Sequence, residues 1–363
     1  MKIGKSRKVA LLFTLFSIAM AGIASGGSYE FLLDQISKSD YQAYVENLVG
    51  FGSRYLYSPG NTSAKDYIYN QFSANGLIVS YDYFYYNGNY YQNVVGTLPG
   101  TAHPEEIFIL GAHFDSLPAG TDSPGADDNA SGVAAILEIA SVLSNYRFGC
   151  TIQFVAFNAE EQGLRGSKAY ADKSKANGDN IKGMINFDMI AYTGNNPLGD
   201  IEIMGDAWLV DAFSANSFAY VPSLFTESHY GNVYGSDNYY FHSTKYDGSA
   251  SILLVEDTPN EIWGGSNPYY HKSTDLPENL DYDFAWNVAK AATATMADIS
   301  GIQSAKGDVN GDGFINLQDA ILALRILSNF QSIDVQRDAD VNGDGLIGIE
   351  EVVFILQEVG AVQ

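Results

Sequence analysis

Cysteine is almost absent from this 363-residue sequence: Cys150 is the one example, so no disulfide can form within the chain. Cys150 opens the apolar run CTIQFVAF, and we expect a buried, unreactive thiol there. Cations are scarce as well. Nineteen Lys and Arg face 43 Asp and Glu, giving a formal net charge of −24. A chain this acidic is not expected to bind nucleic acid or anionic membranes.

Long hydrophobic runs are missing too, except near the start of the chain. The run from Val9 to Met20 follows four cations and overlaps the small-residue pattern Ala19-Met20-Ala21. This arrangement predicts a secretory signal peptide over residues 1–25. The run is shorter than the about 18 apolar residues of a membrane-spanning helix. We therefore expect a secreted protein with no membrane span after cleavage, held at a cell surface or in a complex only through a partner.

Strand-like and helix-like segments alternate over the body of the chain. Short apolar runs at 107–110, 151–157, 184–187 and 251–255 predict buried strands, and 131–146 has the spacing of an amphipathic helix. The Tyr-rich segment 81–96 predicts a hairpin around Asn87-Gly88. The alternation predicts an α/β domain over residues 26–300, with a mostly parallel mixed sheet sandwiched by helices.

Acids and histidines follow these predicted strands directly. His113 and Asp115 come after the first run, Glu160 and Glu161 after the second, and Asp188 after the third. His271 lies in NPYYHKSTD, in the loop after the fourth run. Each residue alone has an ordinary explanation, such as a surface histidine, a solvated helix start or, for Asp127-Asp128, a turn. Because the carboxyl ends of parallel strands meet in one crevice, their coincidence predicts a shared metal site.

The predicted ligand types select the metal. Imidazole and carboxylate without thiolate suit zinc, and cobalt or manganese would also accept them. Two His and three carboxylates are too many for one catalytic zinc, but they suit two ions about 3.5–4 Å apart with one bridging carboxylate. A neighbouring carboxylate that binds no metal could transfer a proton, and the adjacent Glu160 and Glu161 could divide these two roles.

These motifs together carry a family resemblance. GAHFDS, PGADDNASG, FNAEEQGLRGS, NFDMI and NPYYHKSTD resemble the secreted di-zinc aminopeptidases of the bacterial leucyl aminopeptidase type, metallopeptidase family 28, over residues 30–300. The resemblance implies a zinc exopeptidase fold, two zinc ions, and hydrolysis of peptides that have a free N-terminus. It also implies a cis peptide between Asp127 and Asp128.

The resemblance further implies a role for each matched residue. Asp127 would bridge the two zinc ions, with Glu161 and His271 completing one and His113 and Asp188 the other. Glu160 would be the general acid and base, Asp115 would orient the His113 ring, and Tyr270 would polarise the scissile carbonyl.

Related activities remain open at this stage. Glutaminyl-peptide cyclotransferases and carboxypeptidases resemble the same family, and an inert interaction protein could keep the fold. Carboxypeptidase relatives usually insert a domain, and only 83 positions separate Asp188 from His271. Inert relatives usually lose a ligand or the catalytic Glu, and this chain keeps both. The loop 230–240 has no cysteine, whereas some members have a disulfide there, so side-chain preference stays open. Aromatics in 228–241 could line the substrate pocket or simply pack.

The last segment contains an internal repeat. DVNGDGFINLQD at 308–319 and DVNGDGLIGIEE at 340–351 both follow the EF-hand loop rule, and each precedes an apolar, helix-like run. Residues before each loop look unlike a helix. The predicted calcium ligands, with Phe314 and Leu346 acting through their carbonyls, are Asp308, Asn310, Asp312, Phe314, Asn316, Asp319, Asp340, Asn342, Asp344, Leu346 and Glu351.

Duplicated calcium loops that are each followed by a helix resemble a dockerin domain. The resemblance implies a small all-α module over 307–363, joined by a short linker at 301–306. It implies two calcium ions and docking onto a cohesin module of another protein. The alternative is a calcium-stapled cap that binds no partner, or one that folds against the catalytic domain.

Overall fold

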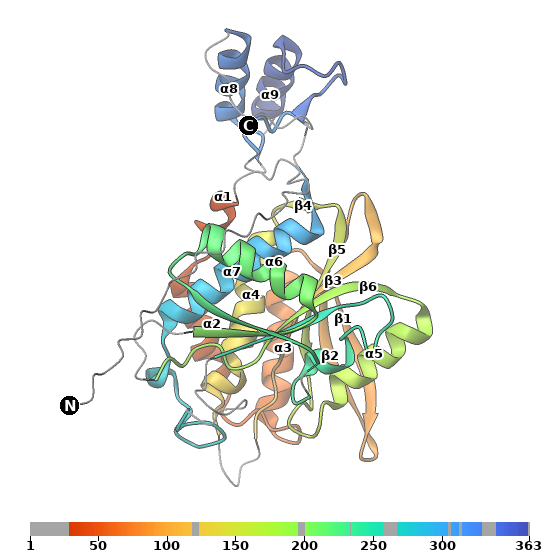
Figure 1. Cartoon of the computed structure of the whole chain (residues 1–363), viewed down its shortest axis with the longest axis vertical. Helices are drawn as coiled ribbons and strands as arrows, with labels where there is room; N and C mark the ends of the chain where they lie inside the picture. Colours follow the sequence, from red (N-terminus) through yellow and green to blue (C-terminus); the bar gives the residue numbers. More distant parts are fainter. Residues whose placement is uncertain are drawn as a thin grey trace, which may run out of the picture.

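The computed structural model describes residues 29–117, 123–194, 200–232, 234–256, 267–303, 306–311, 314–328 and 339–361. The predicted signal peptide, residues 1–25, lies outside this range. Within the described residues, none of the helices is long and apolar enough to cross a membrane. Figure 1 shows a large α/β body and, at the C-terminal end of the chain, a pair of helices.

The body is built on an eight-stranded sheet in the order β1-β2-β5-β3-β6-β9-β7-β8. The middle strands β5, β3, β6 and β9 run parallel, while β1, β2 and β7 introduce antiparallel pairs. The mostly parallel mixed sheet predicted from the sequence is confirmed. The strand bounds are β1 (Ile78–Tyr86), β2 (Asn89–Leu98), β3 (His103–His113), β5 (Cys150–Phe157), β6 (Asn180–Phe187), β7 (Asp200–Gly205), β8 (Phe225–Tyr230) and β9 (Ser251–Glu256).

The predicted hairpin is confirmed at its predicted turn. Tyr86 of β1 pairs with Asn89 of β2, which leaves Asn87 and Gly88 as a two-residue loop. Both loop residues have positive φ, 46° and 87°. Tight hairpins require that conformation because its twist matches that of the strands, and Asn-Gly adopts it most readily.

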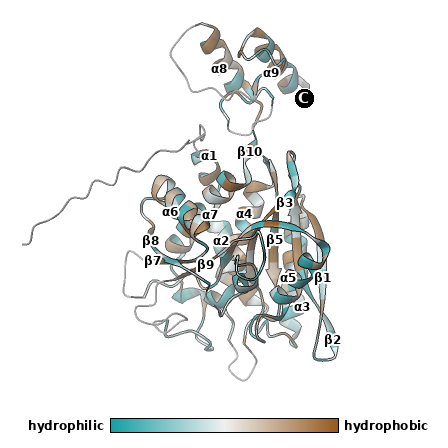
Figure 2. Ribbon diagram, turned by 45° about the vertical axis from the view of Figure 1, so that its right-hand side comes forward, coloured by the Kyte–Doolittle hydropathy of each residue, from teal (hydrophilic) through white to brown (hydrophobic). Residues whose placement is uncertain are grey.

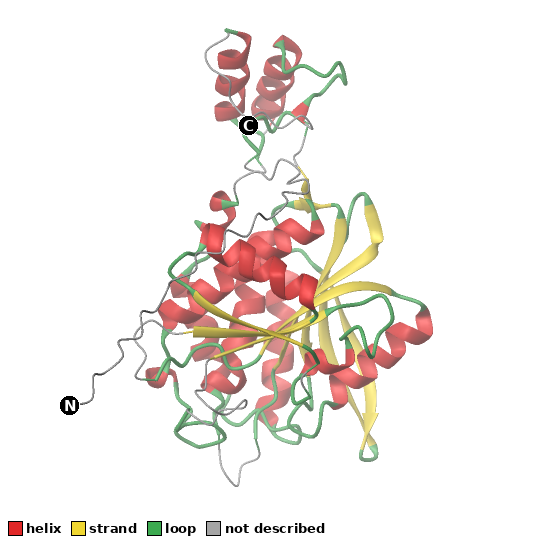
Figure 3. Ribbon diagram, in the orientation of Figure 1, coloured by secondary structure: helices red, strands yellow, loops and turns green. Residues whose placement is uncertain are grey.

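Helices cover both faces of the sheet (Figure 3). One face carries α2 (Lys38–Gly50), α3 (Pro59–Ala74), α4 (Gly132–Leu143), α6 (Ala207–Tyr220) and α7 (Tyr282–Ser300), with the short α1 (Glu30–Leu33) beside α7. The other face carries α5 (Arg165–Asn177) and the 3₁₀ turn η2 (Asp237–Tyr240).

Two apolar clusters therefore sandwich the central strands. Along β3, Phe108, Leu110 and Ala112 face one cluster, whereas Ile109 faces the other. Strands buried on both faces need apolar residues at every position, which explains the continuous runs in the sequence. Brown, hydrophobic segments accordingly gather along the central strands in Figure 2. Cys150, at the start of β5, is buried as predicted, and burial raises the pKa of its thiol to about 11.

The chain order creates a crevice at the carboxyl end of β3. From β3 the chain passes through α4 to β5 on one side, and then through α5 on the opposite face to β6 on the other side. Such a reversal opens a space above the strand ends, where open α/β sheets bind ligands. The sequence places its acids and histidines at this edge.

The C-terminal unit pairs two helices, α8 (Leu317–Leu327) and α9 (Ile349–Ala361). Ala320 and Ala323 of α8 pack with Val352 and Ile355 of α9 in a small core. These two pairs occupy matching positions of the repeat. The preceding strand β10 (Ile302–Gln303) pairs with β4 (Arg147–Phe148) of the body. The first residues of the predicted linker are therefore hydrogen-bonded to the α/β body.

Candidate metal centre

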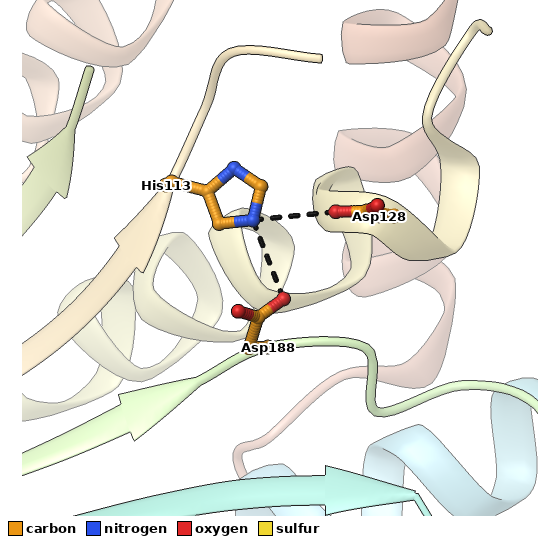
Figure 4. A group of neighbouring side chains, drawn as sticks. All are labelled: His113, Asp128 and Asp188. Atoms are coloured by element: carbon orange, nitrogen blue, oxygen red, sulfur yellow. Dashed lines mark hydrogen bonds and ion pairs between the residues drawn. The ribbon is translucent and has the colours of Figure 1, made fainter. Parts of the chain in front are cut away.

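Five side chains, each from a different segment, meet at the crevice. Two groups, His113–Asp128–Asp188 and Asp128–Glu161–His271, each bring one ligand atom per residue within 4.8 Å of the others. The Nε2 atom of His113 lies 3.3 Å from a carboxylate oxygen of Asp128 and 3.3 Å from one of Asp188 (Figure 4). The structure thus gathers His113, Glu161, Asp188 and His271, four of the five residues predicted as zinc ligands.

The prediction for the fifth ligand is wrong by one position: Asp128, and not Asp127, is the shared carboxylate. One Asp128 oxygen lies 3.3 Å from His113 Nε2, and the other lies 3.1 Å from His271 Nε2. Asp127 turns away, and its oxygens accept hydrogen bonds from the Ala191 backbone N–H at 3.0 Å and the Asn267 side chain at 3.0 Å. The cis peptide is displaced in the same way, to Asp128–Asn129.

The backbone between β3 and α4 explains which aspartate points into the crevice. Residues Ala126–Ser131 form a wide turn, η1, in which Asp128 leaves helical geometry at φ −106° and ψ 86°. The carboxylate of Asp275 accepts the N–H groups of Asp127 at 2.8 Å and Asp128 at 3.1 Å. These bonds fix the two peptide units and leave the Asp128 side chain on the crevice side.

A second buried layer lies under the centre and was not predicted. The Asn267 side chain donates to Asp127 and also to Glu256, at 3.0 and 3.1 Å. Burial raises the pKa of Glu256 well above its usual value and that of Asp127 to about 6. Glu256 ends β9, so the strand-end pattern that identified Asp188 could have found it. Asn267 and Asp275 carried no such signal.

Asp115 links the two sides of the crevice. Its carboxylate accepts the backbone N–H groups of Glu160 at 3.0 Å and Glu161 at 3.2 Å. One of its oxygens also lies 3.7 Å from His113 Nδ1, while its carbonyl lies 3.2 Å from the same atom. Asp115 therefore contacts the His113 ring as expected, and in addition it fixes the turn that carries both glutamates.

Asp188 is held by a hydroxyl from another loop. Ser236 Oγ donates to Asp188 at 2.5 Å and accepts from the Asn186 side chain at 2.7 Å. Ser236 is fully buried, and it belongs to the 228–241 stretch in which the sequence suggested only aromatic pocket residues.

The electrostatics of the group favour a bound cation. Burial would lower the pKa of His113, but the charges of Asp188 and Glu160 raise it well above its usual value. Burial and the Asp128 charge raise the pKa of Glu161 to about 10, and burial raises that of Glu160 strongly. A buried Glu161 oxygen has no hydrogen-bond partner within the described part of the chain. Crowded carboxylates with an unpaired oxygen become favourable when positive charge lies between them.

The donor set fits zinc. Each group offers one imidazole and two carboxylates, with no thiolate, and three protein ligands plus an open position are typical of a catalytic zinc. Asp128 belongs to both groups, as a bridging carboxylate in a two-metal site does. The residues present therefore fit two zinc ions.

The ligands line a cavity of about 230 Å³ that opens to solvent. Its other walls are Glu160, Gly163, Leu164, Met189, Tyr234, Gly235 and Tyr270. Tyr270 stacks on His271 with ring centroids 3.7 Å apart, so it lies directly beside one of the two ligand groups. Tyr234 lies in the aromatic stretch 228–241, which therefore does contribute to the pocket.

The two repeat loops, which the sequence predicts to bind calcium, show the same local pattern. At position 12, Asp319 accepts the N–H groups of Val309 and Asn316, and Glu351 accepts those of Val341 and Gly348, exactly one repeat later. Asp308 and Asp340 likewise accept from Gly311 and Gly343. The residues Asn310, Phe314, Asn342, Asp344 and Leu346 lie on the same loops, while Asp312 lies outside the described residues. Among the described residues, these loops contain no group of three ligand atoms like the two groups of the crevice.

Known proteins resemble the chain over both parts. Over 207 residues it is 32% identical to a probable zinc metalloprotease of Phaeosphaeria nodorum, covering 47% of this chain and 41% of that protein. A probable leucine aminopeptidase of Trichophyton verrucosum is 28% identical over 282 residues, covering 73% and 72%. The chain thus spans less than half of the first relative and most of the second.

Solved structures share the fold at low identity. LapB from Legionella pneumophila aligns with a TM-score of 0.66 at 23% identity, covering 77% of each chain. An aminopeptidase from Aneurinibacillus sp. strain AM-1 gives 0.64 at 18% identity, covering 76% of this chain and 97% of that one. A Bacteroides thetaiotaomicron glutaminyl cyclase aligns with a TM-score of 0.57 at 20% identity, covering 72% of this chain and 97% of that one.

Family profiles match both parts of the chain. Residues 306–348 match the dockerin type I domain, and residues 93–296, more than half of the chain, match peptidase family M28. The chain therefore belongs to peptidase family M28 and carries a C-terminal dockerin domain.

Proposed function

We propose that this chain is a secreted di-zinc aminopeptidase that removes N-terminal residues from peptides and is tethered through its dockerin domain to a cohesin partner. The observation that carries the proposal is the pocket lining. Two histidines and four carboxylates surround the cavity, and its described walls include no Lys or Arg. With Asp128, Glu161 and Asp188 assigned to metal, Glu160 is the carboxylate that can meet a substrate's free α-amine, and the described walls offer no Lys or Arg to hold a free α-carboxylate.

His113 and Asp188 would hold one zinc ion, Glu161 and His271 the other, and Asp128 would serve both. Bound zinc supplies Lewis-acid polarisation of a carbonyl and lowers the pKa of a coordinated water towards neutrality. His113 and Asp188 are kept in place by Asp115 and Ser236, so this side of the site is preorganised.

Glu160 is the proposed general acid and base. It lines the cavity beside Glu161, and Asp115 fixes the backbone of both. Consecutive residues point in different directions, so Glu160 can face the substrate while Glu161 binds metal. Glu160 would take a proton from the attacking water and deliver it to the departing amine. Tyr270, at the cavity wall, can donate a hydrogen bond from its hydroxyl to the oxygen of the scissile carbonyl.

Charge distinguishes this reaction from a carboxypeptidase reaction. A carboxypeptidase must bind a free α-carboxylate, for which Arg or Lys is the usual partner. The described cavity walls offer neither Lys nor Arg for that carboxylate. Glu160, the one lining carboxylate that is not assigned to metal, is available to a substrate amine.

The second metal group argues against a cyclase that uses one zinc. His113, Asp128 and Asp188 form a complete second triad, in which His113 Nε2 lies 3.3 Å from an oxygen of each aspartate. The presence of all five ligands together with Glu160 also argues against an inert interaction protein.

A substrate panel tests the activity. The zinc-loaded chain should release p-nitroaniline from aminoacyl-p-nitroanilides with free N-termini and leave the N-acetylated forms intact. Cleavage of acetylated peptides from the C-terminus, or cyclisation of N-terminal Gln, would contradict the assignment. Zinc content measured on the same sample separates a metal-free preparation from an inert protein.

The tether is supported by two matching exposed helix faces. Leu317, Ile321 and Leu324 of α8 are about half exposed, and so are Ile349, Val353 and Leu356, exactly one repeat later on α9. We propose that calcium holds both loops and that a cohesin module covers these apolar side chains. Substituting Leu317 and Ile349 by Asp should abolish binding of a purified cohesin panel to the full chain, measured by calorimetry. Equal binding by this variant would contradict the interface.

Export and domain limits complete the proposal. The signal peptide over 1–25, the catalytic domain over 26–300, the linker over 301–306 and the dockerin over 307–363 are tested by N-terminal sequencing of the protein recovered from culture medium and by limited proteolysis. A retained Met1 in the recovered protein would contradict export by cleavage.

A further inference from the structure

Arg54 is fully buried just before α3, outside the stretch that matches the peptidase family. Its guanidinium donates to three backbone carbonyls: Nε to Phe114 at 2.8 Å, Nη1 to Pro124 at 2.5 Å and Nη2 to Gly125 at 2.8 Å. A planar guanidinium with its fork of donors is suited to this set of three carbonyls, which a single ammonium group is not.

The three carbonyls belong to two of the segments that carry metal-centre residues, those of His113 and Asp128. Phe114 directly follows His113, and it directly precedes Asp115. Gly125 directly precedes η1, the turn that presents Asp128. One side chain therefore joins the segment that leaves β3 to the turn that supplies the shared carboxylate.

Neighbouring bonds reinforce the same junction. The Arg54 backbone N–H donates to Ser116 Oγ at 3.0 Å, and Ser116 Oγ donates to the carbonyl of Ser123 at 3.2 Å. Ser53 Oγ donates to the carbonyl of Leu117 at 3.2 Å. Both ends of the connection between His113 and Asp128 are thus fixed to residues 53–54.

Gly125 shows how closely the Arg54 guanidinium and the η1 turn approach each other. Its φ is +62°, and a Cβ at this position would lie 2.3 Å from the Asp128 carbonyl oxygen and 2.9 Å from Arg54 Nη2. Glycine is needed at this point for both conformation and space.

A second arm reaches the glutamate turn. Asn61 of α3 donates to the Arg54 carbonyl at 2.8 Å and to the Asn158 side chain at 2.9 Å. Asn158 Oδ1 in turn accepts the N–H of Ala159, next to Glu160, at 2.9 Å. Residues 53–61 therefore bond to three of the segments that surround the crevice, those of His113, Asp128 and Glu160.

We propose that Arg54 is a positioning residue for the metal centre: its three carbonyl bonds hold the His113 and Asp128 segments at the spacing that metal binding requires. This role rests on the proposed di-zinc site. It differs from simple stabilisation because the carbonyls that Arg54 binds flank metal-centre residues. A positioning role therefore affects metal affinity and turnover separately from folding stability.

Two substitutions separate geometry from charge. Arg54→Lys keeps the charge but cannot reach three carbonyls, and Arg54→Met removes both charge and donors. Thr295→Val is the matched control, because Thr295 is fully buried and donates to the Ala291 carbonyl within α7, with no bond to the crevice. Each full-length protein is stripped of metal. Zinc affinity is then measured against a competing chelator, together with Tm, kcat and KM.

We expect Arg54→Lys to bind zinc at least about tenfold more weakly, as happens when outer-shell partners of metal ligands are lost. Its kcat should fall while KM stays near the wild-type value, because Leu164, Met189 and Tyr234 are not held by Arg54. Arg54→Met should lose more affinity than Arg54→Lys. Thr295→Val should lower Tm and leave zinc affinity unchanged.

Two results would overturn the role. Wild-type zinc affinity and kcat in Arg54→Lys would show that the carbonyl bonds do not matter for metal binding. Equal loss of affinity in Thr295→Val, at the same fall in Tm, would show a general stability effect. A wild-type chain that takes up no zinc would instead contradict the di-zinc site itself, and the role with it.

Discussion

Adjacent aspartates provide a matched pair for testing the shared ligand. Asp128→Asn removes the negative charge of the side chain that lies 3.3 Å from His113 and 3.1 Å from His271. Asp127→Asn makes the same chemical change one residue earlier, where the carboxyl faces Ala191 and Asn267. The two variants have the same composition and nearly the same volume, so they differ only in which of the two carboxylates is replaced by an amide.

The expected magnitudes follow from these positions. Asp128 belongs to both metal groups, so its loss weakens two ions together. Since losing even an outer-shell partner costs about 10–100-fold in affinity, losing a shared ligand should cost at least that at each ion. We expect turnover to fall at least about 1,000-fold, or about 4 kcal/mol of transition-state stabilisation. For Asp127→Asn we expect a fall of about tenfold or less, with both ions retained.

The assay measures zinc per chain by elemental analysis after dialysis, followed by turnover of a leucyl-p-nitroanilide at saturating zinc. Circular dichroism of both variants confirms that each is folded. The reasoning is refuted if Asp127→Asn loses both ions while Asp128→Asn keeps them. It is also refuted if the two variants behave alike.

Three further predictions concern other residues. Glu160→Gln should keep wild-type zinc content and lower kcat by about 10²–10⁴-fold, which is the rate acceleration that a general base typically contributes. Full turnover in this variant would contradict the role of Glu160. Burial raises the pKa of Glu138, whose Oε1 accepts the Ser37 N–H, to about 7. Between pH 4.5 and 7 the folded state therefore keeps a proton that the unfolded chain releases. As the pH rises through this range, the free energy of unfolding falls by about 1.4 kcal/mol per pH unit. Glu138→Gln should raise Tm at pH 8 more than at pH 5, and equal shifts would contradict this. Chelating calcium with EGTA should unfold α8 and α9, because their core is small; an unchanged calorimetric trace would contradict calcium binding.

Most of the metal centre could be predicted because its ligands obey a rule that reaches across the fold. His113, Glu161 and Asp188 follow apolar runs, and parallel strands bring such positions to one edge regardless of their separation in sequence. The hairpin at Asn87-Gly88 was predictable for a local reason, since few residues adopt positive φ twice in succession.

The choice between Asp127 and Asp128 was not available from the sequence. Consecutive side chains point in opposite directions, and which one faces the crevice depends on the backbone of η1. That backbone is fixed by Asp275, 147 positions after Asp128. The role of Arg54 could not be predicted from the sequence either. Its acceptors are backbone carbonyls, which every residue type has, so no residue pattern indicates them.

Anomalous diffraction at the zinc edge, from crystals of the zinc-loaded chain, tests the central claim most directly. We predict two zinc peaks beside the Asp128 carboxylate, one contacting His113 and Asp188 and the other contacting Glu161 and His271. A single peak, or two peaks that both avoid Asp128, would contradict the account.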